Sequence, residues 1–190
     1  MTLLEVSLAC FLLTLLMGAT FAIFRAGSLA WSRSQATLDL YQRMRAAAAR
    51  WNQEFAESTP SSLSVQNTTL AFASARQVSF QTNTPSDRPM WQKFVLYYLD
   101  GPQFVLRRRE IPLPSPTTHL SPLPETDVGS GVQPLTYYFS NTQSRVVLGN
   151  VTRSQFDSDG RLVTLQLETQ LAVRGGVQKL AFQISSRCSN

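Results

Sequence analysis

Residues 6–24 form the longest uncharged stretch of the chain, with Glu5 directly before it and Arg25 directly after it. Its 19 residues would span about 28 Å as a helix, close to the thickness of a bilayer's hydrocarbon core. We therefore predict a transmembrane helix over residues 1–24. A simple signal anchor is the alternative interpretation, but it does not explain an acidic residue with no basic residue before it.

The hydrophobic pattern continues as a helix beyond this segment. Between Arg25 and Ser58 there is no proline and only one glycine, Gly27, and Pro60 then prevents further helix. Apolar residues recur at steps of three, four and seven, which predicts an amphipathic continuation over residues 25–59. The stripe consists of Leu38, Tyr41, Met44, Ala48, Trp51 and Phe55, while the charged residues, Glu54 among them, fall mainly elsewhere.

Gly18 is a weak point of the long helix, because glycine costs about 1 kcal/mol relative to alanine in a helix interior. It would let the helix bend when the chain leaves the membrane. Equally, it would permit close packing against a neighbouring helix.

The remaining residues read as short strands and turns, which predicts an antiparallel globular head over residues 60–190 and an α+β fold. Residues 91–99 and 103–111 form a clear hairpin around Asp100-Gly101. Residues 112–134 hold six prolines and are predicted to be a long loop. The other expected strands are 63–66, 70–73, 78–80, 135–139, 151–156, 162–171 and 177–184.

The composition offers little chemistry. The chain of 190 residues has one His, two Cys and only 15% charged residues, so we expect no metal site, no cofactor and no enzymatic activity. His119 lies among prolines and serines without a nucleophile motif. The segment Asp157–Gly160 is similar to a calcium loop, but its glycine and acidic positions do not fit the EF-hand spacing, so a plain turn is expected.

The first residues, Met1-Thr2-Leu3-Leu4-Glu5-Val6, run directly into the apolar helix and resemble the mature N-terminus of the type IV pilin and pseudopilin family. The resemblance implies that a prepilin peptidase removes a short leader and methylates Met1. It also implies a subunit held in the inner membrane with its head outside the cytoplasm. The subunit then joins copies of itself, or related subunits, at an inner-membrane assembly platform to form an extracellular or periplasmic helical filament.

The order of the hairpins extends the resemblance more diffusely. Residues 93–110, the long loop and the late strand around Leu162 resemble the J-type minor pseudopilins of type II secretion and similar minor pilins. Many pilins carry proline where this chain has Ala22, which favours a minor subunit. The resemblance implies a non-catalytic structural subunit of a type IV pilus-like filament, assembled through its N-terminal hydrophobic helix. The alternative is a minor pseudopilin, or a DNA-uptake minor pilin, whose head binds cargo or DNA.

The resemblance also implies that Glu5 pairs one subunit with its neighbour, and there is a physical reason for such a pair. A carboxylate near the membrane interior is costly unless it is paired, and an N-terminal amine is a cation at the same depth. A neighbouring helix displaced along the axis would bring its amine to Glu5 and fix the register between subunits. In the alternative, Glu5 lies at the membrane interface and pairs with nothing.

Arg107-Arg108-Arg109 is the only basic run. On a strand, Arg107 and Arg109 share one face and Arg108 takes the other. The run could contact DNA phosphates or an acidic surface, or it could be a solvated edge that prevents aggregation. Of the two cysteines, Cys10 is expected to be a small apolar residue of the membrane helix. Cys188 would be a free surface thiol or a site of intermolecular pairing.

Overall fold

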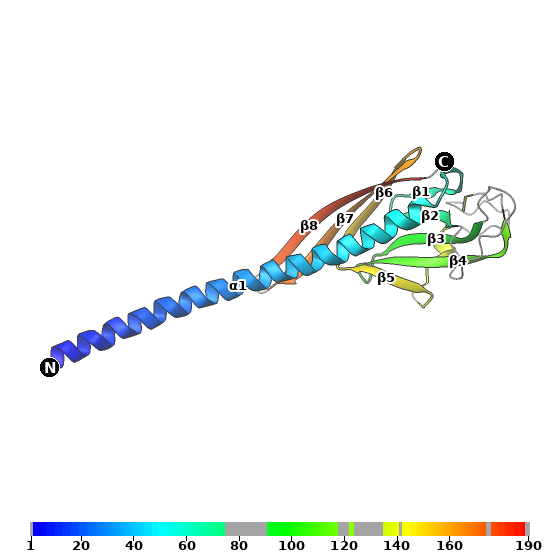
Figure 1. Cartoon of the computed structure of the whole chain (residues 1–190). Coiled ribbons are helices and arrows are strands. Elements are labelled where there is room, and N and C mark those ends of the chain that lie inside the picture. Colours follow the sequence, from blue (N-terminus) through cyan, green and yellow to red (C-terminus); the bar gives the residue numbers. More distant parts are fainter. Residues whose placement is uncertain are drawn as a thin grey trace. The chain divides into compact units, whose positions relative to one another are not determined.

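The expected α+β fold is confirmed: one long N-terminal helix precedes antiparallel strands in two sheets (Figure 1). The computed structural model describes residues 2–74, 91–117, 122–123, 135–140, 142–173 and 176–188. The chain divides into two compact units. The stem unit comprises Met1–Gln42 and Leu171–Gln178, and the head unit comprises Arg43–Gln170 and Lys179–Asn190.

Helix α1 spans Leu3–Ala56 and has 54 residues, about 80 Å at 1.5 Å per residue. It passes through Gly18 and Gly27 without interruption. It ends where the backbone N–H and the hydroxyl of Ser58 both donate to the Phe55 carbonyl, at 3.0 and 2.7 Å. Pro60 then opens the short 3-10 helix η1, Pro60–Ser62. A single helix therefore joins the stem unit to the head unit, as the hydrophobic pattern predicted.

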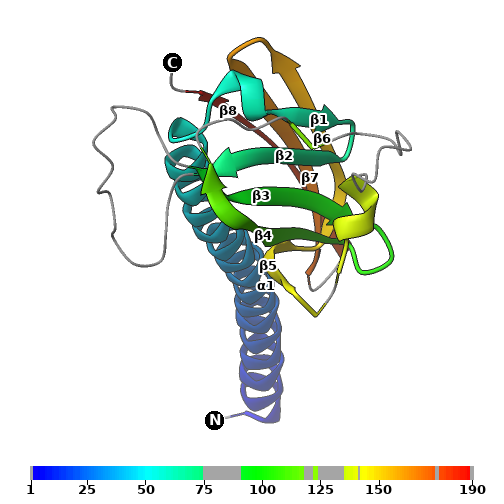
Figure 2. The ribbon, with the colours of Figure 1, turned by 90° about the vertical axis from the view of Figure 1, so that its right-hand side faces the viewer.

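The first sheet has five antiparallel strands in chain order, β1 to β5 (Figure 2). They are β1 Ser64–Gln66, β2 Thr69–Ser74, β3 Trp91–Asp100, β4 Val105–Thr117 and β5 Ser144–Gly149. The predicted hairpin of β3 and β4 is present, with Asp100 paired to Val105 at its closed end.

The second sheet has three strands in the order β6-β7-β8. They are β6 Val151–Asp159, β7 Leu162–Val173 and β8 Gly176–Arg187. Gly160, at φ +59°, makes the turn between β6 and β7, a left-handed conformation that glycine adopts without steric cost. The turn predicted at 157–160 is therefore confirmed at its last residue, while Asp157 to Asp159 continue β6.

One face of the first sheet packs on the part of α1 that belongs to the head unit. The Trp51 ring lies 5.7 Å from Phe55, 5.1 Å from Tyr97 on β3 and 5.7 Å from Phe156 on β6. Phe72 on β2 contacts Phe55 edge to face at 5.4 Å. Such aromatic pairs add to the apolar area that they bury, so this cluster is a principal source of the head unit's stability.

The opposite face of the sheet is also buried, which explains why β3 reads as a nearly continuous apolar run. Alternate residues of β2 and β3 point away from the helix and form a second cluster with Leu123 and Leu135. It contains Ala71, Ala73, Trp91, Phe94, Leu96 and Tyr98. A strand covered on both faces has no position left for an exposed polar side chain.

Two details of the predicted helical stripe are wrong. Leu38 and Tyr41 are half-exposed or more, whereas Leu40, Met44, Trp51 and Phe55 are buried. Leu40 lies two residues, or about 200°, around the helix from Leu38, so these leucines occupy opposite faces. The buried stripe also includes Glu54, only 7% exposed, which the pattern had placed off the stripe.

Two strand assignments also need correction. The segment predicted as a strand at 135–139 is a 3-10 helix, η2 Leu135–Tyr138, and strand β5 was not expected at all. Tyr98 stacks on Phe139 at 4.3 Å and its hydroxyl donates to the Ser140 carbonyl at 2.9 Å, which holds this segment over the sheet rather than in it.

The predicted loop at 112–134 begins later than expected, because β4 continues to Thr117. Among the described residues, β5 pairs only with residues 105–109 of β4, so no described strand pairs with the proline-containing end of β4 on that side. Proline is tolerated at such an edge. The strand expected at 78–80, most of the rest of the loop and His119 lie outside the described residues.

Candidate functional site

The N-terminal part of α1 is apolar, and no described part of the chain covers it. Its large side chains are exposed, from Leu3 at 91% to Phe24 at 72%. An 18-residue window of the helix has a mean hydropathy of 2.2 and none of it is buried. A helix of this length and composition is compatible with anchoring in a membrane. Within the described residues it is the one helix that meets this test.

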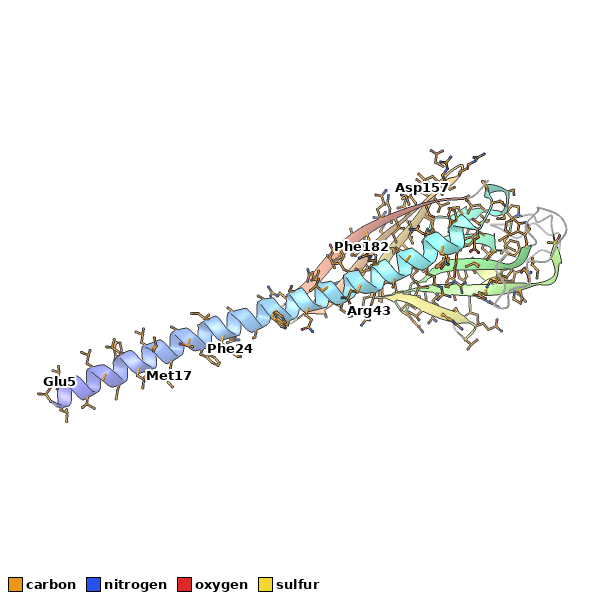
Figure 3. The ribbon with its side chains drawn as sticks, viewed as in Figure 1. Glu5, Met17, Phe24, Arg43, Asp157 and Phe182 are labelled. Atoms are coloured by element: carbon orange, nitrogen blue, oxygen red, sulfur yellow. The ribbon has the colours of Figure 1, made fainter. Side chains whose placement is uncertain are left out.

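Glu5 caps the start of this helix. Its carboxylate accepts a hydrogen bond from the Thr2 backbone N–H at 2.8 Å, and its own N–H donates to the Thr2 hydroxyl at 3.4 Å. This reciprocal arrangement is a capping box, which satisfies two backbone donors at the helix N-terminus. Glu5 remains exposed, so its carboxylate is accessible to a second chain (Figure 3). Met1, the expected site of methylation, lies outside the described residues.

Gly18 and Gly27 have open space around them. A Cβ built at either position would meet no atom within 4 Å. No contact with the described residues therefore requires glycine at these positions, and the helix is regular at both. The role of Gly18 as a point of flexibility stays a prediction.

The arginine run lies on β4, an interior strand between β3 and β5, so the solvated-edge alternative is wrong. Its alternation is as expected. Arg108 faces α1, where two of its nitrogens bind both carboxylate oxygens of Glu54 at 2.8 and 2.9 Å. Arg107 faces the other way, with Asp100 at 2.8 Å, and Arg109 there donates to the Tyr138 carbonyl.

Glu54 is the centre of a buried ion-pair cluster. Besides Arg108, it accepts hydrogen bonds from the Tyr97 hydroxyl at 2.9 Å and from Arg50 at 3.1 Å. Arg108 also contacts Glu110 at 2.6 Å, and Glu110 in turn contacts Lys93 at 2.8 Å. Because every charge has a partner, the cluster avoids the cost of an isolated ion in the interior.

The cluster shifts the pKa values of its members. Burial alone would raise the pKa of the Glu54 carboxyl, but the hydrogen bonds and the charge of Arg108 outweigh it, so this pKa lies below its usual value. Burial and the adjacent Glu54 carboxylate raise the pKa of the Tyr97 phenol. Glu54 is therefore ionised and Tyr97 is neutral across the physiological range.

The ion pairs of the arginine run leave little support for the predicted DNA contact. Arg107 and Arg108 are only 6% and 4% exposed, and both already bind carboxylates. They have little surface to offer a phosphate. The sequence analysis did not identify Glu54 as a buried residue. Its spacing of three residues from Trp51 and four from Ser58 nevertheless places it on the buried face of the helix.

The remaining candidates are the possible metal ligands and the two cysteines. Among the described residues, no group of His, Cys, Asp and Glu is arranged to hold a metal ion. Cys188 is buried at 5% exposure, with its sulfur 3.7 Å from the Ser58 hydroxyl, so the expectation of a surface thiol is wrong. Its position is fixed by its N–H, which donates to the Arg161 carbonyl at 2.9 Å. Cys10 is exposed on α1.

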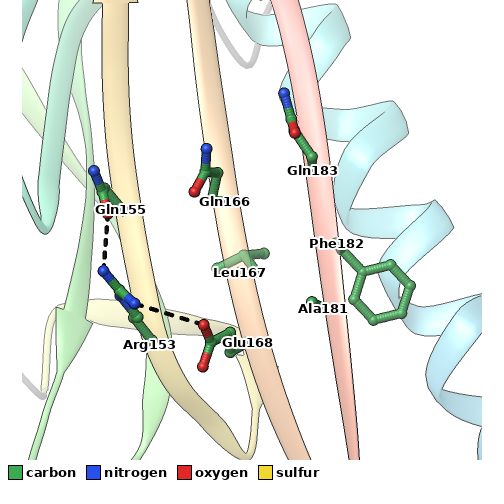
Figure 4. Close-up of a pocket in the computed structure, with 8 residues that line it drawn as sticks. All are labelled: Arg153, Gln155, Gln166, Leu167, Glu168, Ala181, Phe182 and Gln183. Carbon is green, nitrogen blue, oxygen red and sulfur yellow. Dashed lines mark hydrogen bonds and ion pairs between the residues drawn. The ribbon is translucent and has the colours of Figure 1, made fainter.

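A depression of about 320 Å³ lies on the polar face of the second sheet. Gln155, Gln166 and Gln183 line it, one from each strand, and Arg153 pairs there with Glu168 at 3.7 Å (Figure 4). Phe182 points away from these polar groups, toward α1. Each carboxylate and guanidinium here is half-exposed or more, so the depression is a solvated sheet face rather than a built site.

Comparisons with protein-family models, with curated proteins and with solved structures find no match to this chain. The long apolar N-terminal helix followed by an antiparallel sheet head is compatible with a pilin-like fold.

Proposed function

We propose that this chain is a structural, non-catalytic subunit of a type IV pilus-like filament, assembled through its N-terminal hydrophobic helix. The observation that carries the proposal is the division of one continuous helix. Its membrane-side part exposes large apolar residues, and its distal part is buried against the head unit's own strands. An uncovered apolar helix of this length needs either lipid or other helices around it.

Both environments occur in the proposed cycle. The segment at 6–24 holds the subunit in the cytoplasmic membrane after prepilin peptidase acts at Met1. At the assembly platform, the same segment moves from lipid to the helices of other pilin-like subunits. Glu5 then pairs with the N-terminal amine of a neighbour and fixes the register. Its present role as a helix cap is compatible with this, because a carboxylate offers several acceptor positions.

A minor subunit, such as a J-type pseudopilin, would have the same helix and the same Glu5. DNA capture by the head has less support, because Arg107 and Arg108 are already committed to ion pairs inside the head unit.

The test separates charge pairing from helix capping. Glu5→Gln retains the capping geometry but removes the charge, since glutamine also serves in a capping box. Thr2→Ala removes the side-chain cap and keeps the charge. We expect Glu5→Gln and Glu5→Ala to enter filaments at least about tenfold less than the unaltered chain, the equivalent of losing about 1.4 kcal/mol. Thr2→Ala should assemble nearly normally.

Quantitative immunoblots of sheared filaments and of membranes provide the measurement. All variants should be found in the membrane at equal amounts, which controls for insertion and folding. Normal assembly of Glu5→Gln would show that the charge has no role in subunit pairing.

A further inference from the structure

Two aromatic side chains in and just after η2 are exposed on the head unit. Tyr137 is 64% exposed and Phe139 is 39% exposed. The Phe139 ring lies 4.3 Å from the buried ring of Tyr98, with only 4° between the two planes. Because Tyr98 covers one face of this ring, the face left for a ligand is the opposite one. We call Tyr137 and Phe139 the aromatic platform, which lies beside the end of β3 (Figure 2).

Contacts with the sheet hold the aromatic platform in place. The Tyr98 hydroxyl donates to the Ser140 carbonyl at 2.9 Å and accepts a hydrogen bond from the Ser140 N–H at 3.1 Å. Arg109 donates to the Tyr138 carbonyl, and its guanidinium lies 6.0 Å from the centre of the Tyr138 ring. Tyr137 packs edge to face on Tyr138 at 5.4 Å. Rings that are already fixed in this way lose little conformational freedom when a ligand binds.

Uncharged hydrogen-bonding side chains follow the platform in the chain. The hydroxyls of Ser140 and Thr142 share a hydrogen bond at 3.2 Å, and the Gln143 side-chain oxygen accepts one from Arg109. Thr142 and Gln143 are exposed. The Gln143 amide also carries two N–H donors, and each hydroxyl can both donate and accept. We call Ser140, Thr142 and Gln143 the polar rim.

The surface formed by the platform and the rim is uncharged. Between Asp127 and Arg145 the sequence contains no charged residue. Arg145 is paired in register with Arg108, which faces α1, so Arg145 lies on the opposite face of the sheet. The cations on the platform's face of β4 are Arg107 and Arg109, and both are bound to groups of the head unit. Charge complementarity therefore favours a neutral ligand over one rich in phosphate.

We propose that the aromatic platform and the polar rim form a binding site for a neutral oligosaccharide. The C–H bonds on one side of a pyranose ring make an apolar, weakly positive surface, which complements the negative face of an aromatic ring. The sugar hydroxyls donate and accept hydrogen bonds, as do the groups of the polar rim. Tyrosine set among serine, threonine and amide side chains is also a composition found in adaptable binding surfaces.

Two other classes of ligand fit this surface less well. Nucleobases also stack on aromatic rings, but the phosphates between them need cations close to the rings. A folded protein partner needs an interface of about 20–30 residues on each side with a larger apolar centre. Strand β5 adds only Val146 to the exposed large apolar side chains of this face.

The site is a property of the single subunit, so the inference does not depend on filament assembly. A shallow platform makes few contacts, and we expect a Kd of about 1 mM for one site. A filament that repeats the site along its length would hold a polysaccharide more tightly, because each further contact is intramolecular.

Ligand-observed NMR of the full chain in micelles of a zwitterionic detergent tests the site. The detergent must carry no sugar headgroup, since a glycoside detergent would compete for the platform. The probes are the neutral hexasaccharides cellohexaose, chitohexaose and mannohexaose. Saturation of the aromatic protons should transfer to the ring C–H protons of at least one probe, with a Kd of about 1 mM.

Alanine variants of the two aromatic residues connect the binding to the platform. Phe139→Ala and Tyr137→Ala should each weaken binding at least about tenfold. Phe139→Tyr keeps the ring and should bind within about threefold of the unaltered chain. Tyr41→Ala is the matched control, because Tyr41 is 50% exposed in the stem unit, and it should change the Kd by less than about twofold.

Near-ultraviolet circular dichroism checks that each variant is folded. Phe139 also covers Tyr98, so Tyr137→Ala tests the site at a side chain whose loss leaves that stack in place.

Three results would overturn the proposal. One is the absence of saturation transfer to any of the three hexasaccharides at about 10 mM. Another is binding that both alanine variants leave unchanged. The third is displacement of the bound hexasaccharide by a lower concentration of oligothymidylate, which would assign the platform to single-stranded nucleic acid. None of these results bears on filament assembly, which the Glu5 variants test separately.

Discussion

The two parts of helix α1 differ in whether their apolar residues are buried. In the head unit, Trp51 is 2% exposed among Phe55, Tyr97 and Phe156, while Trp31 in the stem unit is 73% exposed. The same residue type in the same helix is a core residue in one part and an uncovered surface in the other. Helix propensity cannot account for this difference. The distal part is covered by strands of the head unit, whereas the apolar side chains of the N-terminal part are exposed.

The acidic residues show the same division. Glu54 is buried and accepts hydrogen bonds from Arg108, Arg50 and Tyr97. Glu5 is exposed, and its carboxylate accepts a hydrogen bond from the Thr2 N–H at the start of the helix. A buried carboxylate with a full set of donors fixes how an element packs. An exposed one at the end of an apolar helix is available for a partner.

The largest expected difference in stability is between alanine variants of the two tryptophans. Trp51→Ala removes the centre of the aromatic cluster and should lower the free energy of unfolding of the head by about 3–5 kcal/mol. Trp31→Ala should change it by less than about 0.5 kcal/mol, because the side chain is exposed. Urea unfolding of the full chain in detergent micelles, followed by near-ultraviolet circular dichroism, measures both. Equal losses would contradict the division of the helix.

Trp51→Phe refines that result. The Trp51 indole N–H has no hydrogen-bond partner among the described residues, so replacing it by phenylalanine removes an unsatisfied donor. We expect this variant to lose clearly less stability than Trp51→Ala in the same unfolding measurement. A loss as large as that of alanine would mean that the indole N–H does have an essential partner.

The buried ion-pair cluster comes next. Arg108→Ala leaves Glu54 buried without its bidentate partner and should cost about 3 kcal/mol or more. Arg153→Ala is the matched control on the second sheet, since its pair with Glu168 is exposed at both ends, and it should change stability by less than about 1 kcal/mol. Thermal unfolding at neutral pH compares the two. Similar losses would show that burial of the pair does not determine its contribution.

Lowering the pH should destabilise the head unit by protonating Glu54. Because the folded-state pKa of Glu54 is below its usual value, the folded state stabilises the ionised form. This contribution is fully present above the unfolded-state pKa of about 4.3 and is lost as the pH falls through the folded-state pKa. Melting temperatures measured between pH 7 and pH 3 should decline below about pH 4.3. Glu54→Gln should make that decline shallower, and an unchanged slope would exclude Glu54 as a source.

The smallest effect concerns the two cysteines. Burial raises the pKa of the Cys188 thiol, and its side chain is enclosed, whereas Cys10 is exposed on α1. A membrane-permeant maleimide should label Cys10 in the folded chain and Cys188 only after the head is unfolded with urea. Peptide mass spectrometry locates the label. Rapid labelling of Cys188 in the folded chain would show that the end of β8 opens readily.

Local patterns predicted those elements whose signals lie within a few residues. The length of α1, the β3–β4 hairpin and the turn at Gly160 follow from periodicity and turn chemistry. The pairing of Glu54 with Arg108 could not be predicted, because the two are 54 residues apart and only the folded sheet brings them together. The η2 segment was misread for a similar reason. Its aromatic residues favour a strand, but contacts with Tyr98 determine its conformation.

The candidate site residues also divide into those that local sequence identifies and those whose environment depends on the fold. The apolar segment, Glu5 and Gly18 are recognisable from the first residues of the chain, and the roles of Glu5 and Gly18 stay predictions. The burial of the arginine run was not predictable, since the same local sequence can form buried ion pairs or an exposed basic patch. Its three members differ only in which neighbours the sheet gives them.

The most direct test of filament assembly is the amount and N-terminal mass of this chain in filaments sheared from the cell surface or recovered from the periplasm. The proposal predicts that the full chain is present in the filament fraction with a methylated N-terminus at Met1, and that Glu5→Gln depletes it there but not in the membrane. A chain found solely in the membrane fraction, with an unmethylated N-terminus, would contradict the proposal.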